Sequence, residues 1–190
     1  MEANLQEDKK FEQLDLSEQK VTNKEFVACE FVNCNFSKAN LSNNDFVDCY
    51  FKGCNLALVQ FSNTGLKNVQ FSQCKLMGID FSKCNTFLFS VGFENSQLDY
   101  SVFFQKKMKK ASFKDCSLKE VDFSEVDLSM SVFQNCDLLN ASFNRSILEK
   151  TDFRTAYNFG IDPELNKMKH AKFSTEGLSG LLSKYQLDID

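Results

Sequence analysis

The sequence predicts an all-β solenoid, and three observations support this fold class. Phe or Leu recurs at every fifth residue over most of the chain, whereas an α-helix repeats every 3.6 residues and a plain strand every two. Of the 21 Phe, 15 lie on this five-residue ladder, so the aromatic residues should form the core. The position two residues before each ladder residue is mostly small or β-branched, as expected for a second inward-facing side chain. A sustained short period indicates a repeat architecture.

The ladder positions run from Phe26 to Phe153 and hold almost only Phe and Leu. They are Phe26, Phe31, Phe36, Leu41, Phe46, Phe51, Leu56, Phe61, Leu66, Phe71, Leu76, Phe81, Leu88, Phe93, Leu98, Phe103, Met108, Phe113, Leu118, Phe123, Leu128, Phe133, Leu138, Phe143, Leu148 and Phe153. We assign residues 26–158 to the repeat body. Residues 1–25 are expected to form a tail and an irregular capping coil, because Gln19 and Lys24 fit the small position poorly.

Two irregularities interrupt the ladder. Seven residues separate Phe81 from Leu88, which predicts a bulge near Asn85–Phe87 that leaves Phe87 and Phe89 at outward positions. The second irregularity is Lys106, which takes a small inward position. Since a buried charge needs a partner, we expect a loop or a distorted corner there.

Residues 159–190 are predicted to form a separate C-terminal module. The segment Ile161–Glu164 reads as a turn that leads away from the coils, and Ala171–Phe173 resembles one last rung. Ser174 is a candidate N-cap for a helix over 177–184, and 187–190 alternates like a short closing strand. The apolar residues of the module are Leu178, Leu181, Leu182, Tyr185, Leu187 and Ile189.

Composition limits the function classes. The net charge of -4 and pI near 5.2 argue against direct nucleic-acid binding, which normally needs a basic face. We find no long apolar run or signal segment, so we expect a cytoplasmic protein with no membrane contact. All eight Cys occupy the small position, which indicates buried, reduced thiols with no metal or other cofactor. They are Cys29, Cys34, Cys49, Cys54, Cys74, Cys84, Cys116 and Cys136.

Catalysis is poorly supported by the sequence. The single His, His170, lies beside a lysine-rich turn, and no Ser-His-Asp set, metalloprotease motif or glycine-rich phosphate loop is present. We therefore expect a protein that is not an enzyme and that acts through its outer faces.

Two groups of residues are candidates for partner binding. The first is acidic and consists of Asp115, Glu120, Asp122, Glu125, Asp127 and Asp137, which form either a solvated surface or an acidic stripe. The second lies at the two irregularities and consists of Phe87, Phe89, Phe104, Lys106 and Lys107. Packing over the bulge explains these aromatic residues simply, and an interaction surface is the alternative.

The units Cys34-Asn35-Phe36-Ser37-Lys38 and Ala39-Asn40-Leu41-Ser42-Asn43 carry a resemblance to a known family. They resemble the pentapeptide-repeat consensus A-(D/N)-L-x-x over about two-thirds of the chain. That resemblance implies a right-handed quadrilateral β-helix with four pentapeptides per coil. The long ladder, the Cys-rich small position and the ending from Gly160 to Asn166 resemble the topoisomerase-protecting branch, which includes the Qnr and McbG proteins.

This branch implies an acidic, DNA-like rod that dimerises through its C-terminal module and acts on DNA gyrase or topoisomerase IV. The function it implies here is resistance or immunity to a topoisomerase poison, either a quinolone or a peptide toxin. The chain lacks an insertion as large as the Qnr loops, and the Lys106–Lys110 cluster departs from a uniformly acidic rod. A general protein-interaction scaffold without topoisomerase activity is the alternative.

Overall fold

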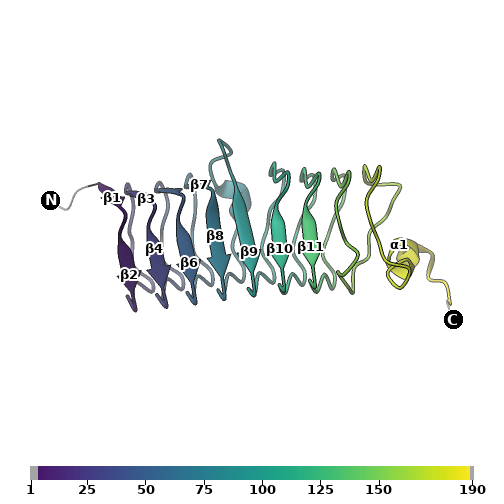
Figure 1. Cartoon of the computed structure of the whole chain (residues 1–190), viewed down its shortest axis with the longest axis horizontal. Coiled ribbons are helices and arrows are strands. Elements are labelled where there is room, and N and C mark those ends of the chain that lie inside the picture. The colour runs from purple at the N-terminus through teal and green to yellow at the C-terminus, as the bar shows by residue number, and fades with distance from the viewer. Residues whose placement is uncertain (1–3, 189–190) are drawn as a thin grey trace.

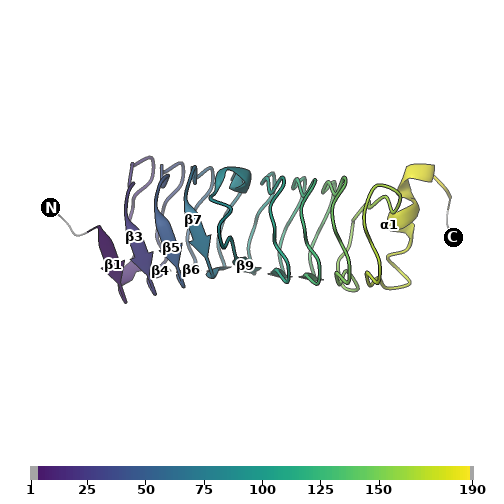
Figure 2. The same cartoon turned by 90° about the horizontal axis from the view of Figure 1, so that it is seen from above.

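The computed structural model describes residues 4–188 and shows a rod of stacked coils, with β1 (Leu5–Glu7) at one end and α1 (Ser179–Leu182) at the other (Figures 1 and 2). Residues paired between neighbouring coils are 20 positions apart, as Asn35 and Asn55 are, so a regular coil holds four five-residue units. The predicted all-β solenoid is confirmed. We number the four faces of the rod first to fourth, in the order in which each coil visits them, starting from β1.

Parallel sheets cover two of the faces. The first face carries a sheet of β1, β3 (Glu25–Val27), β5 (Asp45–Val47) and β7 (Gly65–Lys67). The second face carries a sheet of β2 (Lys10–Glu12), β4 (Glu30–Val32), β6 (Tyr50–Lys52), β8 (Val69–Ser72), β9 (Val91–Glu94), β10 (Ser112–Lys114) and β11 (Val132–Gln134). Single bridges such as Asn35 with Asn55 hold the third face, and bridges such as Val102 with Asp122 hold the fourth.

Ladder side chains fill the interior of the rod. On the second face, nine Phe rings form one stack, with neighbouring centroids 4.6 to 5.4 Å apart. These rings belong to Phe11, Phe31, Phe51, Phe71, Phe93, Phe113, Phe133, Phe153 and Phe173. An aromatic pair contributes about 0.5–1.5 kcal/mol beyond the area that it buries. The stack therefore stabilises the contact between each coil and the next.

The small positions are also buried, and all eight Cys lie there as predicted. Cys34 and Cys54 belong to one internal column, in which the backbone N–H of Cys34 donates to Sγ of Cys54 at 3.4 Å. Burial raises the pKa of Cys49 to about 11 and that of Cys84 to about 12. Because both values lie well above neutrality, these thiols behave as small apolar side chains.

Most corners of the rod are made by a residue with left-handed φ. Asn33 and Asn43 have φ values of 53° and 58°, and Gly53 and Gly78 have values of 65° and 69°. Asn and Gly tolerate this region better than most residues do. The outward end of each five-residue unit therefore favours these two residue types.

Residues 4–23 form a regular coil, which differs from the irregular capping coil that we expected. β1 pairs with β3 and β2 pairs with β4, in the register that later coils also use. Phe11, Leu16 and Val21 are half-buried around an opening of about 430 Å³ at this end of the rod. Hydrogen bonding to the next coil is sufficient to order this coil even where Gln19 and Lys24 replace small residues.

The bulge lies where the sequence predicted it, after the 3₁₀ turn η1 (Phe81–Lys83), and its loop projects from the rod (Figure 1). The predicted side-chain directions within it were wrong. Leu88, which we assigned to the ladder, is 64% exposed, whereas Phe89, expected to face out, is only 7% exposed. The reason is that Leu88 has a left-handed φ of 54° and makes an additional corner. That corner turns the next side chain, Phe89, into the core.

The prediction of a loop or distorted corner at Lys106 was also wrong. Lys106 is 2% exposed inside a regular coil, and the neighbouring ladder residue Met108 is 4% exposed. Nζ of Lys106 donates to the carbonyl oxygen of Cys84 at 2.6 Å and lies 5.1 Å from the centroid of the Phe89 ring. The bulge thus leaves room for the long side chain and supplies its partners. A residue this buried cannot contact a partner protein directly, contrary to our expectation for Lys106.

The coils continue beyond the predicted boundary at residue 159. Lys167 bridges to Ile147, Lys172 bridges to Asp152, and the Phe173 ring stacks on that of Phe153 at 5.2 Å. The predicted turn near Pro163 is present, but it lies within a coil and does not lead away from the rod.

The C-terminal helix is shorter than predicted. α1 spans Ser179–Leu182 and is followed by the 3₁₀ turn η2 (Ser183–Tyr185). The predicted closing strand is not formed by Leu187 and Asp188, and Ile189 and Asp190 lie outside the described residues. Gly180 allows α1 to approach the rod closely, because an added Cβ would lie 2.4 Å from the carbonyl oxygen of Phe159.

Candidate partner-binding surfaces

The six carboxylates predicted as a candidate acidic stripe lie on different faces. Asp137 belongs to the third face, Asp122 to the fourth and Asp127 to the first, as their bridges to neighbouring coils show. Left-handed corner positions hold the remaining three, Asp115, Glu120 and Glu125. The geometry therefore gives a dispersed set of carboxylates and no single continuous stripe.

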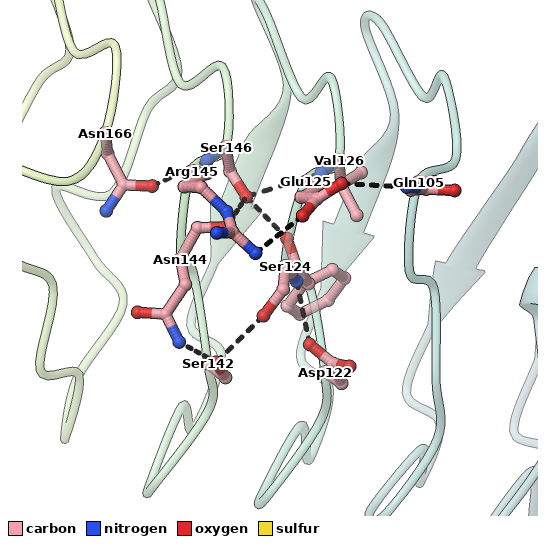
Figure 3. Close-up of polar contacts among 11 residues, drawn as sticks. Gln105, Asp122, Ser124, Glu125, Val126, Ser142, Asn144, Arg145, Ser146 and Asn166 are labelled. Carbon is pink, nitrogen blue, oxygen red and sulfur yellow. Dashed lines mark hydrogen bonds and ion pairs between the residues drawn. The ribbon is translucent and has the colours of Figure 1, made fainter.

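Several of these carboxylates are engaged by neighbouring side chains. Glu125 accepts hydrogen bonds from Nη2 of Arg145 at 2.7 Å and from Nε2 of Gln105 at 2.8 Å (Figure 3). Asp122 accepts from the backbone N–H of Ser124 at 2.8 Å in the same region. These contacts fix the turn between the fourth and first faces and offset the charge of Glu125.

Asp127 and Asp137 are largely covered, since each carboxylate side chain is 14% exposed. Burial favours the neutral acid at Asp127, but hydrogen bonds from Ser129 and the ion pair with Lys109 outweigh it and hold its pKa below the ordinary range. Asp137 pairs with Nζ of Lys119 at 3.3 Å. Both carboxylates thus have structural partners in the rod.

Asp115 and Glu120 are the members of this set that are exposed and have no ion-pair partner among residues 4–188. Asp115 accepts a hydrogen bond from Nδ2 of Asn135, one coil away, at 2.9 Å. Of the predicted acidic residues, these two present the most accessible negative charge.

The candidates at the two irregularities also divide into exposed and buried residues. Phe87 is 65% exposed on the bulge, where Nζ of Lys67 lies 6.0 Å from its ring centroid. Phe104 is 37% exposed on the fourth face, and Lys107 is exposed on the first. Phe89 is buried, as described above. The bulge therefore presents Phe87 and the unpredicted Leu88 as an apolar tip.

Apolar side chains gather at the C-terminal end of the rod. Leu178, Leu182, Tyr185 and Leu187 are 39 to 57% exposed, whereas Leu181 packs against the core of its own chain. Ile189 lies outside the described residues. Three further apolar residues near this end, which the sequence pattern did not single out, are exposed: Leu139, Tyr157 and Leu165. Placing the sequence in its coil register would have shown that Leu139 and Tyr157 share the third face.

Ion pairs attach the C-terminal segment to the last coils. Nζ of Lys184 lies 2.9 Å from Oδ1 of Asp162 and 2.6 Å from Oε2 of Glu164. The hydrogen bond from Lys184 holds the pKa of Asp162 below its ordinary value. A hollow of about 520 Å³ lies beside this segment and is lined in part by Tyr157, Phe159 and Ser183.

The structure offers little for catalysis or metal binding in its described part. His170 is exposed at a corner with φ of 61°. Within residues 4–188, no group of three His, Cys, Asp or Glu is placed to hold a metal ion. Helices in this range are too short to cross a bilayer.

The repeat geometry agrees with a known family. A family model described as a pentapeptide repeat region matches residues 24–103, and one described as pentapeptide repeats in eight copies matches residues 122–156. The chain belongs to the pentapeptide-repeat family. No curated protein matches it in sequence.

Solved structures of QnrB1, a plasmid-mediated fluoroquinolone resistance protein, share the fold of this pentapeptide-repeat protein. A trypsin-treated variant of QnrB1 matches with a TM-score of 0.65 and 20% identity, over 98% of this chain and 91% of that chain. Full-length QnrB1 matches with a TM-score of 0.58 and 18% identity, over 94% of this chain and 100% of that one. At this level of identity the similarity concerns the fold.

Proposed function

We propose that this pentapeptide-repeat protein is a non-enzymatic, cytoplasmic partner of DNA gyrase or topoisomerase IV that gives resistance or immunity to a topoisomerase poison. The observation that carries the proposal is the match to QnrB1, a fluoroquinolone resistance protein, along nearly the whole length of both chains. The poison is a quinolone or a peptide toxin that acts on the same enzyme.

The proposed contacts with the topoisomerase are the exposed members of the predicted set. The apolar tip of the bulge, Phe87 and Leu88, supplies an anchor, because aromatic and apolar side chains contribute most of the energy at protein interfaces. Phe104 lies on the fourth face and Lys107 on the first, in the coil that follows the bulge. The exposed carboxylates Asp115 and Glu120 provide negative charge to an enzyme surface that normally binds DNA.

We also propose that the rod is a homodimer joined at its C-terminal end. The exposed residues Leu178, Leu182, Tyr185 and Leu187 form a self-complementary apolar patch suited to a two-fold interface. Replacing Leu178 and Leu182 by Ser should give a monomer in light scattering. The matched control replaces Leu58, which is 54% exposed on the repeat body, and should leave the dimer intact.

The dispersion of the acidic residues over several faces favours a second candidate function, a general protein-interaction scaffold with no topoisomerase activity. A supercoiling assay with gyrase and a quinolone or a peptide toxin separates the two. Protection by the wild type, lost in the double variant Phe87→Ser/Leu88→Ser and retained in Leu58→Ser, supports the topoisomerase proposal. Absence of both rescue and inhibition at micromolar protein would leave the scaffold as the function.

A further inference from the structure

Unpaired positive charge gathers on one face of the C-terminal half of the rod. From residue 107 onward, cations on the other faces have carboxylate partners, such as Lys114 with Glu94 and Arg145 with Glu125. The exposed cations of this part of the chain that lack a carboxylate partner among the described residues all lie on the first face or its corner. They are Lys107, Lys110, Lys150, Lys167 and Lys169. We call these five residues the first-face lysines.

The coil register places the first-face lysines on one surface. Lys107 and Lys167 belong to the same column of bridges, which runs from Lys107 through Asp127 and Ile147. Lys110 and Lys150 occupy the corner between the first and second faces, with left-handed φ values of 61° and 58°. Three coil steps separate Lys107 from Lys167, which corresponds to about 14 Å along the rod at the usual strand spacing.

This surface is strongly basic although the protein is acidic. The first-face lysines and Lys109 give six positive charges, against the two negative charges of Asp127 and Glu149. The part of the first face from residue 107 onward therefore carries a net charge of +4 in a chain whose total is -4, so all other residues together carry -8. An anionic partner is attracted to this face and repelled by the rest of the molecule.

The chemistry of the face fits phosphate groups better than a protein surface. Among the described residues of this face that the lysines span, the exposed large apolar residues are Met130, 42% exposed, and Leu165 at the opposite corner. The apolar tip of the bulge, Phe87 and Leu88, lies on the same face one coil before Lys107 and outside this span, whereas protein interfaces usually have an apolar centre. The charged groups are ammonium ions on flexible stems, which bind phosphates as point charges. Among the described residues, no unpaired guanidinium lies on this face, so none is free to form bidentate hydrogen bonds with a base edge. We therefore expect no sequence preference.

We infer that the first-face lysines form a binding surface for the phosphate backbone of double-stranded DNA, without sequence specificity. The separation of about 14 Å between the lysine groups at its two ends is close to the ~12 Å width of the major groove. Lys107 and Lys110 can then contact one strand while Lys167 and Lys169 contact the other. This inference does not depend on the proposed topoisomerase function.

The net charge of the whole chain, -4, argues against nucleic-acid binding, whereas the charge of this face favours it. A net charge describes the average over all faces, whereas binding depends on the local field at one face. The net charge and the local field differ in this fold because residues on one face recur once per coil and are far apart in the sequence.

The test is fluorescence anisotropy of a labelled mixed-sequence 30-base-pair duplex titrated with the full chain at several salt concentrations. Five phosphate contacts predict a slope of log K against log salt of about -4.5, and an affinity loss of roughly 500-fold between 50 and 200 mM salt. The triple variant Lys150→Gln/Lys167→Gln/Lys169→Gln should reduce the slope to about -2 and weaken binding at 50 mM by at least about tenfold.

The matched control is Lys20→Gln/Lys52→Gln/Lys75→Gln. These lysines are also exposed and without ion-pair partners among the described residues, and their loss changes the net charge by the same amount. The control should bind the duplex within about twofold of the wild type. Circular dichroism of both triple variants checks that the coils remain folded.

Three outcomes overturn the inference. The first is no binding by the wild type at 50 mM salt and 50 μM protein, roughly the weak end of non-specific affinity. The second is an equal loss of affinity in the two triple variants, which would make the effect one of net charge. The third is tighter binding of a poly-glutamate peptide than of the duplex, which would assign the face to an acidic protein.

Discussion

Nζ of Lys106 donates a hydrogen bond to the carbonyl oxygen of Cys84 at 2.6 Å, and this contact joins the coil after the bulge to the residue just before it. The same Nζ lies 5.1 Å from the ring centroid of Phe89, at the far end of the bulge. Lys106 therefore contacts both ends of the projecting loop.

The first prediction concerns the stability cost of the buried ammonium group. Lys106→Met keeps most of the volume and removes the charge, so the free energy of unfolding should change by less than about 1 kcal/mol or increase. Lys106→Ala leaves a cavity and should cost about 2–4 kcal/mol. Urea unfolding at pH 7 measures both, and equal losses in the two variants would contradict a packing role for the stem.

The pH dependence of Lys106 gives a second prediction. Burial lowers its pKa below the ordinary 10.5, with smaller opposing effects from Cys84 and Asp80. The unfolded chain then binds the proton more tightly than the folded protein, so stability increases as the pH rises from the folded pKa towards 10.5. The difference in unfolding free energy between wild type and Lys106→Met should therefore shift in favour of the wild type over this interval. A difference that is constant with pH would exclude a lowered pKa.

The two bulge aromatics should differ sharply in their contribution to stability. Phe89 packs in the core 6.5 Å from the Phe81 ring, so Phe89→Ala should cost about 3–5 kcal/mol. Phe87 is exposed, and Phe87→Ala should change stability by about 0.5 kcal/mol or less. The denaturant midpoints of the two variants test this difference, and a loss for Phe89→Ala as small as that for Phe87→Ala would restore the outward direction of both rings expected from the sequence.

Thiol chemistry tests the cysteine columns. Because burial raises the pKa of Cys49 to about 11, this thiol should react very slowly with a disulfide reagent at pH 8 in the native protein and fast in urea. Ser112→Cys places a thiol on an exposed position and is the matched control, with fast reaction in the native state. The neutral thiol also contributes stability that is present below pH 9 and lost as the pH rises through 11. Rapid native labelling of the core thiols would contradict their burial.

Gly180 should be necessary for the position of the C-terminal helix. A Cβ at this residue would lie 2.4 Å from the carbonyl oxygen of Phe159 and 2.7 Å from its ring, so Gly180→Ala should displace α1 from the rod. We expect a lower melting temperature and, on the dimer proposal, a monomer in light scattering. Ser179→Ala, at the exposed neighbouring position, is the control and should behave as wild type. A stable dimeric Gly180→Ala protein would show that α1 does not need this close approach.

The five-residue period predicted the solenoid, its core residues and the position of the cysteines. In a regular repeat, the position of a residue within its five-residue unit determines whether its side chain faces inward or outward. The errors fell where the period breaks. Leu88 and Phe89 exchanged places because an additional left-handed corner inside the bulge cannot be inferred from spacing. Lys106 was expected to distort its coil because its partners, Cys84 and Phe89, come from the preceding coil and are distant from it in the sequence.

The surfaces were less predictable than the core. The acidic residues between Asp115 and Asp137 are close in sequence, yet the coils distribute them over different faces. Conversely, Lys107 and Lys167 are far apart in sequence and share a face. A local sequence window therefore cannot find a charged surface on this fold, whereas a comparison of equivalent positions in successive coils can.

The aromatic stack has a consequence for how such a rod can change its length. The bulge adds residues between Phe71 and Phe93, and their rings still stack at 5.4 Å, much as the rings of Phe93 and Phe113 do at 5.3 Å without a bulge. The axial spacing is thus independent of how much chain a corner contains. Loops can be grafted or trimmed at the corners without moving the neighbouring coils, and a duplicated coil would extend the rod by one step of about 4.8 Å. Rods of this kind can therefore evolve in length and in loop content separately.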